Sequence, residues 1–207
     1  MFDIKKEIKL AFVENKFAIV FSIAILFISL LLGYFLQPYV VNYLNPVVEE
    51  FTKKVQSGVI TLTFQSIFLN NIRIVFLMFI LGLLFCFSAL ILAFNGFFVG
   101  YFVASKGNLL TNLILIIPHG IFEFSSCILA CASGFVLFNF IIKFLKAWFN
   151  EKNKSFINKL SISFDLSFDK LKQAFILLVI SSILMVIAGL FEVYLTLPIA
   201  NFIFSFS

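Results

Sequence analysis

Charged residues are scarce in this sequence. Only 12% of its 207 residues are Asp, Glu, Lys or Arg, whereas 62% are hydrophobic. A soluble domain has about a quarter of its residues charged and about half apolar. Too little polar surface is present to cover a water-soluble globule, so lipid must cover most of the chain. The composition predicts a single membrane-embedded domain over residues 1–207, multi-pass in a cell membrane.

Metal ligands are also few. The chain has one His and three Cys, and no two cysteines have the C-x-x-C spacing. Cys86, Cys127 and Cys131 all lie within apolar runs, where cysteine packs as a small hydrophobic residue. Because structural zinc takes about four nitrogen or sulfur ligands, we expect no metal site, and no cofactor is indicated.

Motifs of the common enzyme classes are missing as well. The sequence has no H-E-x-x-H, no G-x-S-x-G and no Walker loop, so we expect that the protein is not an enzyme. Its net charge is +5, but the lysines flank apolar segments and form no patch suited to nucleic acid. We expect them to bind anionic lipid and to set the topology.

Long apolar runs are what the sequence does have. A helix of about 20 apolar residues crosses a bilayer, which predicts an all-α, polytopic helical membrane protein with about five spans. The expected spans are 17–36, 72–94, 95–117, 118–142 and 173–200. The third is interrupted by glycine and polar residues, so we expect a broken span there.

The segments between the spans have their own patterns. Residues 1–16 have apolar residues at helical spacing with lysines between them, which predicts an interfacial helix on the membrane surface. A second interfacial helix is expected from Pro46 to about Gly58, because proline suits the first turn of a helix. Residues 143–172 form a Lys-rich loop.

Lysine density predicts which side each segment faces. Segments 1–16 and 143–172 are rich in lysine, whereas 37–71 has only two. Since positively charged loops stay in the cytoplasm, the N-terminus and Lys152 are expected inside, and Lys53 outside. Residues 94 and 143 are then both expected inside, so the chain between them must cross the membrane an even number of times. The broken stretch is therefore counted as a span.

The middle of the chain contains a pattern of polar and small residues. It comprises Asn70, Asn71 and Arg73 before an apolar run with Gly82, then Asn95, Gly96 and Gly100, then Pro118-His119-Gly120-Ile121-Phe122-Glu123, and finally Gly134. Over about residues 65–140 this pattern resembles the stage II sporulation protein M family of integral membrane proteins. The Pro-His-Gly-x-x-Glu element is its most specific part.

The resemblance implies a function. The named member of that family works with peptidoglycan-degrading partners during engulfment in spore formers, and the family extends to organisms without spores, archaea included. We therefore expect an integral membrane scaffold or assembly protein that organises cell-envelope partners. The alternative is a transporter or channel subunit with a polar centre at His119 and Glu123, because broken spans and helices starting at mid-membrane line pathways in transporters.

His119 and Glu123 are one helical turn apart and share a face. A carboxylate at mid-membrane costs about 3 kcal/mol on insertion scales, so Glu123 should not face lipid. The two residues could form a proton-sensitive or cation-binding pair. Alternatively, Glu123 caps the broken span, while His119 satisfies a carbonyl freed near Pro118.

Two further charges lie in apolar surroundings. Arg73 either pairs with Glu123 or extends to the interface. Glu192 lies deep in the last span, where Asn95 or the break at 106–108 is its expected partner unless it reaches water.

The spacing of Gly96 and Gly100 permits close helix packing, within one chain or between chains. The expected consequence is a homo-oligomer, most simply a homodimer, in addition to any other membrane or envelope partners.

Overall fold

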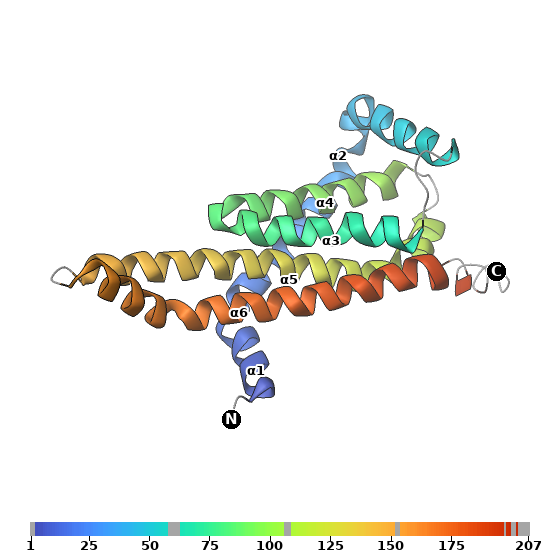
Figure 1. Ribbon diagram of the computed structural model, residues 1–207. Coiled ribbons are helices and arrows are strands. Elements are labelled where there is room, and N and C mark those ends of the chain that lie inside the picture. Colours follow the sequence, from blue (N-terminus) through green and yellow to red (C-terminus); the bar gives the residue numbers. More distant parts are fainter. Residues whose placement is uncertain are drawn as a thin grey trace.

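The computed structural model describes residues 3–57, 63–105, 109–151, 154–196, 198–199 and 202; the side chains at 51, 52, 55, 110 and 112 fall outside the description. The described part of the chain is helical and without strands (Figure 1). Its elements are α1 (Ile4–Glu14), α2 (Lys16–Gln56), α3 (Phe64–Leu81), η1 (Gly82–Leu84), α4 (Cys86–Ser105), α5 (Leu109–Asn150), α6 (Phe156–Leu190) and the π-helical η2 (Phe191–Leu195). Five helices in the described residues are long and apolar enough to cross a membrane. The predicted class, an all-α polytopic membrane protein, is confirmed.

Helix α1 begins where its sequence provides a cap. The Asp3 carboxylate accepts hydrogen bonds from the backbone N–H groups of Lys5 (3.0 Å) and Lys6 (3.3 Å), which satisfies two of the free donors at a helix start. In Figure 1, α1 runs across the direction of α5 and α6. If the long helices cross the membrane, this orientation suits a helix lying along its surface.

Helix α2 is longer than the expected first span. It contains residues 17–36 but continues as helix through Pro38 and Pro46 to Gln56. The prediction that Pro46 starts a separate helix was wrong, and Gly58 lies outside the described residues. Figure 1 shows the last turns of α2 running at an angle to its first part, as expected when prolines remove backbone hydrogen bonds and bend a helix.

Helices α3 and α4 form a hairpin whose turn is entirely apolar. The turn lies at Gly82–Cys86, inside the expected 72–94 span, so that boundary is corrected. Phe85 has a φ of 50° and a ψ of −67°, and its N–H donates to the Gly82 carbonyl at 2.9 Å. This tight, rarely populated backbone conformation is held by ring contacts of Phe85 with Phe135 and Phe138.

The expected broken span at 95–117 is not confirmed. Residues 95–105 form the last part of one continuous helix, α4, and residues 109–117 form the first part of α5. Residues 106–108 lie outside the described residues. Pro118 was expected to start a helix but lies inside α5. Proline is tolerated within membrane helices when neighbouring groups satisfy the freed carbonyl.

Helices α5 and α6 form the longest antiparallel pair (Figure 1). Ser126 and Ser181 hold them together, each hydroxyl donating to the other's backbone carbonyl, at 2.7 and 2.8 Å. Small buried residues on α5, including Ala130, Ala132 and Ser133, permit this close approach, as is common between membrane helices.

The paired helices extend beyond the α3–α4 turn. Phe85 at that turn contacts Phe138, and α5 then continues for about 18 Å to Asn150, at the ~1.5 Å rise of an α-helix. Figure 1 shows this extension of α5 and α6 past the end of α3 and α4. The region 143–172 is therefore mostly helical, with a short connection between Asn150 and Phe156. We call residues 139–150 and 156–168 the hairpin tip.

The topology leads to a labelling prediction. In a variant with the three native cysteines replaced, Lys53→Cys is expected to react with an impermeant maleimide in intact cells, and Lys154→Cys is not. Lys152, the position chosen from the sequence, is outside the described residues, so Lys154 replaces it. Both positions should react after the cells are permeabilised. Reaction at 154 but not at 53 in intact cells would reverse the predicted orientation.

Candidate functional site: a polar centre between α5 and α6

Two helices supply the polar residues of this site. Helix α5 carries His119 and Glu123 one turn apart, while η2 carries Glu192 and is followed directly by Thr196. Nδ1 of His119 lies 3.2 Å from Oγ1 of Thr196. We call these four residues the polar centre.

The hydrogen bonds of Thr196 define the state of His119. The Thr196 hydroxyl donates to the Phe191 carbonyl at 3.0 Å, so its oxygen is left to accept from His119. This assigns the proton of the neutral imidazole to Nδ1 and leaves Nε2 as an acceptor. The arrangement depends on the π-helical turn at Phe191–Leu195, a local widening often found at functional sites.

Glu123 on α5 and Glu192 on η2 lie near each other. They are close enough for their negative charges to repel. Among the described residues, neither carboxylate has a hydrogen bond or a salt bridge, and burial among apolar helices weakens the hydration of both. Two carboxylates in such surroundings are costly unless protons or a cation neutralise them.

A pocket of about 240 Å³ opens beside Glu123. Helices α4 and α5 form it, and its walls are mainly aromatic and aliphatic. It is lined by Phe98, Val99, Phe102, Ile116, His119, Glu123 and Phe124. A largely apolar pocket with a few convergent polar groups is the usual form of a small-molecule site.

Arg73 does not join the polar centre. It lies on the exposed face of α3, and within the described chain it has no salt bridge. The expected ion pair with Glu123 is therefore not formed within this chain, and extension of the side chain toward the interface is the remaining interpretation. The Asn71 side chain accepts a hydrogen bond from the Asn70 amide at 3.4 Å.

Gly96 and Gly100 pack α4 against α2 within the chain. A Cβ atom at Gly96 would lie 2.8 Å from the Leu26 carbonyl oxygen, and one at Gly100 would lie 2.9 Å from the Tyr34 backbone nitrogen. This face is thus used inside the subunit and is not free for a second copy. Asn95, beside it, donates to the Ile91 carbonyl at 2.9 Å and does not contact Glu192.

Gly120 differs from these two glycines. A Cβ there would lie 3.2 Å from the Ile116 γ-methyl group and 3.4 Å from the Phe124 ring, and both neighbours are side chains. The Pro118-His119-Gly120 element therefore places His119 and Glu123 without requiring a close backbone approach at Gly120.

Sequence reasoning missed several residues of this site. Thr196 gave no signal, because a threonine near the end of an apolar helix is common. Phe98 and Phe102 are one turn apart on α4, a spacing visible in the sequence, but the chain has 32 phenylalanines and many pairs share it. The described residues contain no group of His, Cys, Asp and Glu suited to a metal ion.

A second polar cluster lies where α1 meets α6. Lys170 donates to Glu14 (3.0 Å), Asn15 (3.1 Å) and Gln173 (2.7 Å), and Lys172 pairs with Glu7 at 2.9 Å. Gln173 also donates to Glu14 and accepts from Asn15. Hydrogen bonds from Gln173 and then Lys170 hold the pKa of Glu14 below its usual value. This cluster fixes α1 to the bundle, and the sequence did not predict it.

The fold and the polar centre together define a class: a polytopic helical membrane protein with a charged pocket among its spans. The family model for stage II sporulation protein M matches residues 17–197, and the chain belongs to that family. The match covers most of the chain and so extends well beyond the 65–140 stretch that carries the sequence resemblance.

Two archaeal relatives are similar over much of their length. The uncharacterized protein MJ0706 of Methanocaldococcus jannaschii is 33% identical over 218 residues, covering 99% of this chain and 92% of that protein. The uncharacterized protein MJ0793 of the same organism is 35% identical over 151 residues, covering 70% of this chain and 76% of that protein. No solved structure matches the chain significantly.

Proposed function

We propose that this protein is a membrane scaffold of the stage II sporulation protein M type, which organises cell-envelope partners through its hairpin tip. The observation that carries the proposal is the exposed apolar surface there. Phe149 is 68% exposed, Phe156 69% and Ile157 75%. Beyond the membrane-crossing part of the bundle, such large apolar groups would face water, and exposed apolar patches are typical of interaction surfaces.

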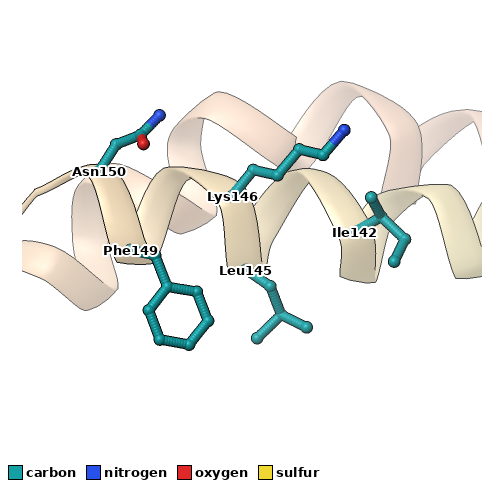
Figure 2. Close-up of a pocket in the computed structure, with 5 residues that line it drawn as sticks. All are labelled: Ile142, Leu145, Lys146, Phe149 and Asn150. Atoms are coloured by element: carbon teal, nitrogen blue, oxygen red, sulfur yellow. The ribbon is translucent and has the colours of Figure 1, made fainter.

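A shallow groove on α5 adds shape to this surface. Figure 2 shows Leu145 and Phe149 pointing to one side of the helix and Lys146 and Asn150 to the other. The groove is formed by these residues together with Ile142. An apolar stripe bordered by a cation and an amide suits an amphipathic helix of a partner with acidic residues along its edge.

Photo-crosslinking tests the scaffold proposal. A benzophenone amino acid at Phe149 or at Phe156 is expected to give the same discrete protein adduct in cells. Placed at Phe27, which is 58% exposed on the membrane-crossing part of α2, the same probe should yield lipid adducts only. The two hairpin positions should give the same adduct because both belong to the hairpin tip.

A substitution pair completes this test. Phe149→Ser is expected to reduce recovery of the adduct partner at least fivefold with little change in the melting temperature, because most of the Phe149 side chain is exposed. Tyr39→Ser, at a highly exposed position (78%) on α2, is the control and should leave recovery unchanged. Absence of a protein adduct at both hairpin positions would contradict the proposal.

The pocket at Glu123 favours a second candidate, a transporter or channel subunit. Its support is a carboxylate without a partner in the described residues beside a cavity, a feature of substrate pathways. The scaffold proposal is preferred because five spans in one short chain enclose little volume. A proton or cation flux into proteoliposomes that Glu123→Gln abolishes would reverse this preference.

A further inference from the structure

The pocket beside Glu123 has several aromatic rings in its wall. Phe98 and Phe102 come from α4 and Phe124 from α5, so three aromatic rings line a space of about 240 Å³. Aromatic faces attract cations, and the attraction grows where water is excluded. Such walls favour a ligand that combines a positive charge with apolar carbon.

The polar side of the pocket has the complementary charge. Glu123 is half-buried between the helices and lines the pocket. Glu192 on η2 adds a second negative charge nearby. In the described part of the chain, no lysine or arginine forms a salt bridge with either carboxylate. His119 lines the same pocket and offers its Nε2 as a hydrogen-bond acceptor.

We propose that this pocket binds a small alkylammonium ion. The ammonium group would lie against Glu123 and donate to His119, and the carbon chain would pack on Phe98, Phe102 and Phe124. A pocket of about 240 Å³ suits a ligand with a few carbon atoms. Hard metal ions fit poorly, because they need several oxygen ligands and the pocket provides one carboxylate among apolar walls.

This inference goes beyond the scaffold proposal and does not depend on it. The pocket lies among the membrane-crossing helices, whereas the partner surface lies on the hairpin tip. Loss of partner binding at the tip and loss of ligand binding at the pocket are separate results, so either proposal can fail without the other.

Equilibrium dialysis of radiolabelled butylammonium against the full chain in nanodiscs tests the site. We expect saturable binding of one ion per chain, with no competition from butan-1-ol, which has the carbon chain without the charge. Sodium chloride at matched ionic strength should not compete either. Glu123→Gln and Phe102→Leu are each expected to weaken binding at least tenfold, because one removes the charge and the other removes an aromatic face.

A matched control comes from the same helix. Phe87→Leu, on α4 near the turn and outside the pocket, should leave binding unchanged. If Glu123→Gln does not fold, Phe102→Leu carries the same expectation. Uptake that does not saturate, or that neither pocket variant alters, would show partition into lipid and overturn the proposal. Lys106→Gln is the last variant, since Lys106 lies outside the described residues. If butylammonium binds to this variant but not to the parent, the cation of the site is Lys106 itself, and the proposal is overturned.

Discussion

Replacing Gly100 with alanine is expected to lower the melting temperature of the purified protein by about 5–10 °C. The added Cβ would overlap the Leu30 carbonyl oxygen and lie 2.9 Å from the Tyr34 nitrogen. Both obstacles are backbone atoms of α2, which cannot move without moving the whole helix. Gly33 on α2 faces the Phe97 backbone in the same way, so the two helices are in contact along their backbones from both sides.

Gly120→Ala is the matched control for this substitution. It adds the same methyl group to a membrane helix but meets only side chains, the Ile116 γ-methyl group at 3.2 Å and the Phe124 ring at 3.4 Å. Its melting temperature should stay within about 2 °C of the parent, since the neighbouring side chains can shift. Equal melting temperatures for Gly100→Ala and the parent, measured by circular dichroism or scanning fluorimetry, would show that α2 and α4 are not packed this closely.

Gln173→Leu is expected to cost a similar amount, about 2–3 kcal/mol or about 5–10 °C in melting temperature. Gln173 donates to Glu14 and accepts from Asn15 and Lys170. Leucine fills the same space but forms none of these hydrogen bonds. The buried Lys170 would keep only two of its three partners. Gln65→Leu is the control, because Gln65 is exposed on α3 and its loss should have little effect.

The same cluster predicts how stability depends on pH. The pKa of Glu14 is lowered from its usual 4.5, first by Gln173 and then by Lys170. A carboxylate with a lowered pKa stabilises the folded state above its unfolded pKa, and this contribution is lost as the pH falls. The melting temperature of the parent should therefore fall more steeply below about pH 5 than that of Gln173→Leu, which lacks the largest cause of the shift. Parallel pH profiles would exclude this role for Gln173.

The sequence predicted the number of spans because length and apolarity determine it. It did not predict where α3 ends, because Gly82-Leu83-Leu84-Phe85-Cys86 contains no polar residue to mark a turn. That turn depends on tertiary contacts: Gly82 lies against Gly134 of α5, leaving no room for a Cβ on either. Contacts of this kind are invisible in a local pattern of residues.

The sequence predicted only part of the polar centre, for a related reason. His119 and Glu123 stand out because charged and titratable residues are rare in apolar helices. Their neighbours depend on how α5 pairs with α6, which local patterns do not determine. Asn95 was expected to contact Glu192, but it bonds to its own helix, whereas Glu192 lies near Glu123. The Gly96 and Gly100 spacing correctly indicated close packing, yet the same spacing could not distinguish packing within a chain from packing between chains.

Continuity of α5 has a mechanical consequence. From Glu123 to Phe149 the helix is uninterrupted and contains no proline, since Pro118 lies before this stretch. The distance between the two residues is about 39 Å along the helix axis, at the ~1.5 Å rise per residue. A tilt of about 5° centred on Glu123 would displace Phe149 by about 3 Å over that length. The helix is thus a lever arm whose fixed end lies among the membrane helices. Small displacements at the pocket become larger ones at the hairpin tip.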